Sequence, residues 1–116
     1  SVGEPVDLIT IDVSFISLRI VVPPVLQFMK ANAAALALIK PQFEVGKGQV
    51  GKGGVVRDPR LHQQVLDELT VFFRRMPLSV SGVIDSPVLG PKGNKEFFIF
   101  LQRLPADHDI SNASPQ

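Results

Sequence analysis

Residues 34–59 read AALALIKPQFEVGKGQVGKGGVVRDP, and this stretch decides the fold. The run at 34–40 is short, apolar and stopped by Pro41, which predicts a buried strand. Asp58 followed by Pro59 is an N-cap with proline at the first helical position, so we expect a helix to begin there. A strand and a capped helix joined by a glycine-rich connection are typical of an α/β layer.

The residues before this stretch predict one further strand and one helix. Val6–Val13 (VDLITIDV) is β-branched and nearly continuous in apolar character, so we expect a buried strand in a parallel sheet. Ser17–Lys30 has the apolar spacing of a helix. Because Pro23 and Pro24 lie inside it, we expect a break or kink there, with a second part of the helix starting at the prolines.

The residues after this stretch predict a long helix and a pair of strands. The strands are expected at Leu78–Ile84 and Glu96–Leu104, and the Pro- and Gly-rich loop between them favours antiparallel pairing. The predicted fold class is therefore α/β, with a mixed sheet of parallel strands and an antiparallel last strand, flanked by helices. The apolar residues that form one stripe on the long helix are Leu61, Val65, Leu66, Leu69, Phe72, Phe73 and Met76.

Composition excludes several classes of function. The chain has 116 residues, a mass of 12.6 kDa and 45% hydrophobic residues, which suits one compact domain. A formal net charge of +1 does not indicate a generally basic surface, and the lack of Cys excludes disulfides and thiolate metal sites. No apolar run approaches the ~20 residues that a spanning helix needs, so we expect a cytoplasmic protein without membrane contact.

The glycine-rich stretch has two interpretations. Gly46, Gly48 and Gly51 match the dinucleotide fingerprint on paper, but no helix follows them directly, so we reject a dinucleotide site. A mobile surface loop is the simpler interpretation. The functional one uses the cations spaced along the stretch, which are suited to RNA phosphates. These predicted RNA-binding residues are Lys47, Lys52 and Arg57.

Ionisable residues stand at the strand ends. Asp12 and Lys40 follow the first two strands, and Glu96 begins the antiparallel fourth strand, so all three are expected at one edge of the sheet. Opposing influences on the charge state of Lys40 would suit a proton-transfer site. His62 and His108 have no metal-ligand spacing, and we interpret both as surface residues.

Four motifs follow one another along the chain: DVSFIS at 12–17, IKPQFE at 39–44, VGKGGVVRDP at 50–59 and GNKEF at 93–97. Together they resemble the hemolysin-A-like (TlyA-type) ribosomal RNA 2′-O-methyltransferases of the FtsJ-like superfamily. The resemblance implies a Rossmann-like fold and S-adenosylmethionine as cofactor. It implies Lys40 as the base, with Asp12 and Glu96 completing the catalytic residues present here, and a cofactor contact through Asp12, Val13, Ser14 and Phe15.

The resemblance also implies that part of the family pattern is missing. The first lysine of the catalytic set and the glycine-rich donor loop have no counterpart, and the chain opens with Ser1 rather than Met. We therefore expect residues 1–104 to be the C-terminal half of a methyltransferase domain and 105–116 to be a flexible tail. On this interpretation the 116 residues alone are expected to be inactive and not to bind S-adenosylmethionine.

Alternatives remain within and outside the enzyme class. Amine N-methylation is disfavoured because the site reads Asp12-Val-Ser-Phe15, without the prolines of those enzymes. The resemblance implies a ribose 2′-hydroxyl of cytidine as the substrate, in ribosomal RNA or a ribosomal subunit. A non-enzymatic module that forms homo-oligomers through the exposed edge of its first strand is the alternative from another class.

Overall fold

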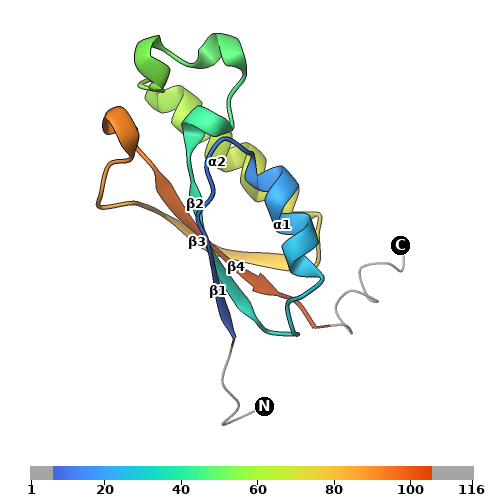
Figure 1. The fold of residues 1–116 in the computed structure, drawn as a ribbon. Coiled ribbons are helices and arrows are strands. Elements are labelled where there is room, and N and C mark those ends of the chain that lie inside the picture. The colour runs from blue at the N-terminus through green and yellow to red at the C-terminus, as the bar shows by residue number, and fades with distance from the viewer. Residues whose placement is uncertain (1–6, 106–116) are drawn as a thin grey trace.

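A four-stranded mixed sheet forms the centre of the molecule (Figure 1), and the computed structural model describes residues 7–105. The strand order is β1-β2-β4-β3, with β1 parallel to β2 and β4 antiparallel to both of its neighbours. The predicted α/β class with a mixed sheet is thereby confirmed. The strands are β1 (Leu8–Ile11), β2 (Ala34–Ile39), β3 (Leu78–Asp85) and β4 (Phe97–Arg103).

Two α-helices, α1 (Leu18–Leu26) and α2 (Pro59–Arg74), cover the same face of the sheet (Figure 1). Alternate residues of the two central strands point to that face, as the period of two in a strand requires. Full burial of a side chain such as Phe73 contributes about 2–3 kcal/mol. The core residues on this face include Leu18, Val22 and Leu26 of α1, Val65, Leu69 and Phe73 of α2, and Ala35, Ala37, Ile39, Phe97, Ile99 and Leu101 of the strands.

The opposite face of the sheet is apolar and only partly buried. Phe100 and Ile84 are exposed there, and a shallow hollow of about 240 Å³ runs between them. The described residues thus form two layers, one sheet and one layer of helices (Figure 1).

The first strand is shorter and more exposed than predicted. It runs over Leu8–Ile11, whereas a buried strand over Val6–Val13 was expected; Val6 lies outside the described residues. Only Ile11 is buried in it, and Leu8 is 60% exposed. The reason is position, because β1 is an edge strand whose single neighbour in the described sheet is β2.

The helix break expected at Pro23 and Pro24 is wrong. α1 is one helix through both prolines and ends at Leu26. The prolines fall in its last turn, so their missing N–H groups remove only the two intrahelical hydrogen bonds to the carbonyls of Arg19 and Ile20. Packing of one face of α1 into the core holds the helix together across the prolines.

The glycine-rich stretch also has more structure than predicted. It contains two short 3₁₀ turns, η2 (Lys47–Gln49) and η3 (Lys52–Gly54), and a third, η1 (Pro41–Phe43), follows β2 directly. A further turn, η4 (Pro91–Gly93), lies in the loop before β4. The predicted helix start at Asp58 is confirmed, since its side chain accepts a hydrogen bond from the backbone N–H of Arg60. Most of the predicted tail, 106–116, lies outside the described residues.

Candidate active site at the carboxyl ends of β1 and β2

Lys40 and Asp12 meet just beyond the ends of neighbouring parallel strands. The Lys40 Nζ lies 2.6 Å from Asp12 Oδ1 and donates a hydrogen bond of 2.9 Å to Ser14 Oγ. The Lys40 side chain is 11% exposed and the Asp12 side chain 66% exposed. These contacts use two of the three ammonium donors. The site therefore combines a largely buried ammonium, held by Asp12 and Ser14, with a carboxylate that is open to a ligand.

The segment after Asp12 presents an aromatic ring to solvent. Phe15 is 88% exposed and has a φ of 68°, a left-handed conformation that is uncommon for a bulky residue. Its ring lies 4.9 Å from the ring of Phe43, centroid to centroid, with a tilt of 48°. The turn between β1 and α1 thus holds Phe15 against η1, in the same region as the Lys40–Asp12 pair.

Glu44 fastens this turn to the segment after β2. Its carboxylate, whose side chain is 2% exposed, accepts from Ser17 Oγ at 2.6 Å and from the backbone N–H of Leu18 at 2.8 Å. Arg19 donates a longer bond of 3.4 Å to the same group. Because α1 has no acidic residue in its own first turn, Glu44 supplies the negative charge that a helix N-terminus favours. The two motifs IKPQFE and DVSFIS therefore form one unit.

Glu96 lies in a closed environment and forms no ion pair with Lys40 among the described residues. Its carboxylate accepts a hydrogen bond of 3.0 Å from Gln42 Nε2, and the residue is 4% exposed. The Oε1 atom of Gln42 is buried without a partner among the described residues. A Cβ at Gly90 would collide with the Glu96 carboxylate, so the loop before β4 seals this group.

The three predicted catalytic residues are thus brought together only in part. Ile39 pairs with Phe97 between β2 and β4; Lys40 comes directly after Ile39, and Glu96 comes directly before Phe97. In the part of the chain that the structure describes, Lys40 and Glu96 nevertheless form no ion pair. The Lys40 ammonium is drawn instead to Asp12 on the other neighbouring strand. Gln42 was not identified from the sequence as part of the site. The available signal was its position two residues after Lys40, in a turn that begins with Pro41.

The predicted RNA-binding residues lie along the connection between β2 and α2. Lys47 begins η2, Lys52 begins η3, and Arg57 lies just before α2. Lys52 and Arg57 are exposed. In Figure 1 this connection, drawn in green, forms an excursion beyond the start of α2.

The interpretation of His62 as a surface residue is wrong. His62 is 9% exposed, its Nε2 lies 2.7 Å from the carbonyl oxygen of Val56, and its ring meets the Phe97 ring edge-on. The signal was present in the sequence, because His62 stands four residues before Leu66 and eleven before Phe73, on the apolar stripe of α2. His108 lies outside the described residues.

The described residues 7–105 contain neither a metal-binding cluster nor a membrane-spanning helix. No group of three or more His, Asp and Glu side chains there is arranged to hold a metal ion. In the same range, no helix is both long enough and apolar enough to cross a membrane.

Comparison with known proteins finds a matching family model and several similar proteins. The family model "FtsJ-like methyltransferase" matches residues 1–103. The 16S/23S rRNA (cytidine-2′-O)-methyltransferase TlyA of Mycobacterium tuberculosis is 43% identical over 111 residues, which cover 96% of this chain and 41% of that protein. Hemolysin A of Brachyspira hyodysenteriae is 34% identical over 100 residues, covering 78% of this chain and 38% of its own length.

A solved structure shares the fold. The crystal structure of a "putative hemolysin" from Lactococcus lactis superposes with a TM-score of 0.79 at 38% identity, over 91% of this chain and 52% of that one. The chain spans roughly two fifths of the length of the curated relatives it matches, 41% and 38%.

Proposed function

The chain belongs to the FtsJ-like methyltransferase family, and on that premise we propose that the protein containing it methylates a ribose 2′-hydroxyl of ribosomal RNA. The proposed donor is S-adenosylmethionine and the proposed target nucleotide is cytidine, as the name of the similar TlyA protein suggests. The observation that carries the proposal is the contact of Lys40 with Asp12 at the ends of two parallel strands. Ligands of open α/β sheets bind at this position.

Lys40 is the proposed base. A ribose hydroxyl is a weak acid, so its reaction needs a positioned acceptor for the proton and a fixed approach to the methyl group. The contacts of Lys40 Nζ with Asp12 and Ser14 fix the position of the nitrogen, which supports this role. In the proposal, Lys40 first releases one proton to solvent, and the neutral amine then orients the hydroxyl and takes its proton at Nζ.

The turn at 12–15 is the proposed contact for the methyl donor. When bound, S-adenosylmethionine supplies a methyl group on a positively charged sulfur. The exposed carboxylate of Asp12 suits a cationic ligand, and the exposed ring of Phe15 suits its flat or apolar parts. Val13 and Ser14 complete the proposed contact, and Ser14 Oγ already holds Lys40.

Glu96 has an indirect role in the proposal. Its carboxylate is buried and bonded by Gln42, which itself follows Lys40 by two residues. From there it adds negative charge on the β4 side of Lys40 without touching the substrate. Lys47, Lys52 and Arg57 supply the proposed contacts to RNA phosphates, since cations spaced along a connection suit a phosphate backbone. A ribosomal substrate would place the protein in the cytoplasm.

A transfer assay tests the proposal. The full-length protein is incubated with methyl-labelled S-adenosylmethionine and ribosomal RNA or subunits, and the labelled nucleotide is identified by mass spectrometry. We expect a 2′-O-methyl group on one cytidine and no transfer to RNA that carries a 2′-deoxy sugar there. Label on a base, or none on RNA, would refute the proposal.

A second candidate is self-association without catalysis, and one observation favours it. The outer edge of β1 has no partner strand among the described residues, and Leu8 is exposed on it. Light scattering tests this candidate, because a monodisperse monomer contradicts pairing through the β1 edge.

A further inference from the structure

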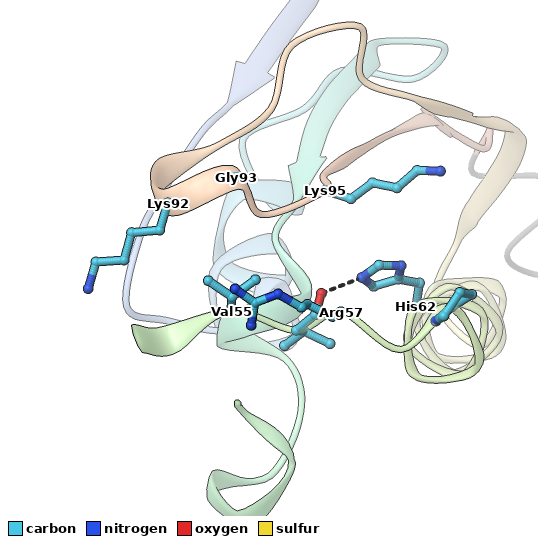
Figure 2. A pocket seen from close by; sticks show the side chains of 8 residues that line it. Val55, Arg57, His62, Lys92, Gly93 and Lys95 are labelled. Atoms are coloured by element: carbon cyan, nitrogen blue, oxygen red, sulfur yellow. Dashed lines mark hydrogen bonds between the residues drawn. The ribbon is translucent and has the colours of Figure 1, made fainter. Parts of the chain in front are cut away.

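A pocket of about 310 Å³ opens between the segment before α2 and the loop before β4 (Figure 2). It is separate from the Lys40–Asp12 pair, and neither of those residues lines it. Its wall combines positively charged side chains with small apolar residues. The lining residues are Val55, Val56, Arg57, Pro59, His62, Lys92, Gly93 and Lys95.

Asn94 joins the two loops that form this pocket. Its side chain is buried, accepts from the backbone N–H of Val56 at 3.0 Å and donates to the carbonyl of Gly54 at 2.9 Å. The same amide also donates to Pro91 O at 3.1 Å in its own loop. An amide offers two donors and two acceptor positions, and three of these four are used here. The two loops that form the pocket are therefore tied to each other by hydrogen bonds.

His62, on α2, also lines this pocket. Its Nε2 lies 2.7 Å from Val56 O (Figure 2). The backbone of Val56 is therefore held at its N–H by Asn94 and at its carbonyl by His62. This explains why a histidine is buried on an apolar stripe. Its ring packs against Phe97 while its ring nitrogen satisfies a carbonyl that the loop leaves free.

The charges of the pocket are of one sign. Arg57, Lys92 and Lys95 line it, and no carboxylate is among its lining residues. Lys95 is engaged elsewhere, because its Nζ lies 3.0 Å from Asp85 Oδ2. In Figure 2 Lys95 extends away from Lys92, whereas Arg57 lies across the middle of the view. Arg57 and Lys92 are both exposed and are the cations available to an anion.

Lys92 is held in an unusual conformation. It has a φ of 60°, in the left-handed region, and the next residue, Gly93, has a φ of 83°. A lysine is uncommon there, since a residue without Cβ adopts this conformation at lower cost. The hydrogen bond from Gly93 N to Gly90 O and the Asn94 contacts maintain this turn, from which the Lys92 side chain extends outward (Figure 2).

We propose that this pocket binds the RNA backbone, with Arg57 and Lys92 as ligands of neighbouring phosphates and Asn94 and His62 as the residues that position the loops. The inference rests on the proposed function for its substrate class, and it extends the predicted contact by Arg57 to a built site with a second cation. Arg57 offers a planar fork to two phosphate oxygens, and Lys92 offers a point charge. The contact carries no base information, so it fixes the register of the RNA rather than its sequence.

The test compares the full-length protein with two charge-matched double variants. In the first, Arg57→Gln and Lys92→Gln remove the pocket cations. In the control, Arg74→Gln and Arg75→Gln remove two exposed cations from the opposite end of α2. Binding of a ribosomal RNA fragment is measured by filter retention at several salt concentrations. Methyl transfer gives KM and kcat separately.

We expect the pocket variant to bind RNA on the order of tenfold more weakly and to lower the slope of log K against log salt by about 1.5, for two lost phosphate contacts. KM should rise with kcat unchanged, because the lost contact is equal in the ground and transition states. The control should keep wild-type binding and slope. Equal behaviour of the two double variants would overturn the inference.

Two further outcomes separate the alternatives. Inorganic phosphate is titrated into wild-type and pocket variant, followed by the chemical shifts of Val56 and Asn94. Phosphate binding that depends on Arg57 and Lys92, with RNA binding unchanged, would assign the pocket to free phosphate and overturn the RNA inference. If wild-type binds RNA through these residues but transfers no methyl group, the proposed function fails and the pocket stands.

Discussion

Asp12 and Glu96 are both carboxylates at the same edge of the sheet, yet their surroundings are opposite. The Asp12 side chain is 66% exposed and pairs with a lysine, whereas Glu96 is 4% exposed, bonds to a neutral amide and is sealed by a glycine. Both lie at the edge of the sheet where the parallel strands end and β4 begins, which is where ligands bind in open α/β sheets. Burial distinguishes them, because only a carboxylate open to solvent can contact a ligand without a movement of the chain.

The difference assigns separate tasks to the two regions. The open pair, Asp12 with Lys40, has the access that chemistry requires. The closed pair, Glu96 with Gln42, joins the turn after β2 to the start of β4. Substitution in the open pair should therefore change activity at constant stability, and substitution in the closed pair should change stability first.

The largest effect is expected from Lys40→Ala in the full-length protein. Loss of a positioned proton acceptor should lower kcat by about 10²–10⁴-fold. The affinity for S-adenosylmethionine, measured by titration calorimetry, should change little, because the proposed donor contacts lie on the turn at 12–15. Lys30→Ala, which breaks the exposed pair with Asp7 at 3.6 Å, is the matched control and should keep wild-type kcat. Equal loss of donor binding and transfer would make Lys40 a structural residue.

The second effect concerns the closed pair. Gln42→Glu removes the only side-chain donor that the described residues give Glu96 and places a second acid against it. We expect the free energy of unfolding at pH 7 to fall by about 2–3 kcal/mol. The loss should shrink as the pH is lowered, because one proton shared between the two acids restores a hydrogen bond. Denaturant unfolding at pH 7 and pH 5 measures it.

Gln63→Glu is the control for this change. Gln63 also donates to a carboxylate, Asp67 Oδ1 at 2.9 Å, but on the exposed side of α2. The same substitution should cost there less than about 0.5 kcal/mol. Similar losses at the two positions would show that burial does not separate the two regions.

The third effect tests the seal over Glu96. Gly90→Ala introduces a methyl group into the space of the Glu96 carboxylate, which must move or shift the loop. We expect a loss of about 1–2 kcal/mol in unfolding free energy. Thermal unfolding measures this loss. At Gly82 a Cβ meets no atom within 4 Å, so Gly82→Ala is the control and should leave the stability unchanged. A Gly90→Ala protein as stable as the control would mean that the loop does not seal Glu96.

The sequence predicted those features whose causes are local. The start of α2 follows from Asp58 and Pro59 alone, and the buried strand β2 follows from its apolar run and Pro41. α1 is different, because its continuity through two prolines depends on core packing and on Glu44, which lies 26 residues from the Leu18 N–H that it accepts. No local pattern contains that contact.

The same distinction holds for the site. Asp12 and Lys40 could be placed together because parallel strands end at one edge. The pairing of Glu96 with Gln42 depends on the 3₁₀ turn after β2, and strand register alone does not contain this turn. His62 could have been placed in the core from its position on the apolar stripe, but its polarity favoured the surface.

The smallest effect is expected at a carboxylate that is neither paired across the sheet nor buried. Hydrogen bonds from the backbone N–H and then the side chain of Arg60 hold the pKa of Asp58 below its ordinary value of 3.8. Its contribution to stability is therefore fully present above that value and is lost as the pH falls through the lower folded-state pKa. Asp58→Asn keeps the helix cap but cannot titrate. Its melting temperature should fall less than that of wild-type between pH 4 and pH 2, and identical profiles would show that this exposed cap does not contribute to the acid sensitivity of the fold.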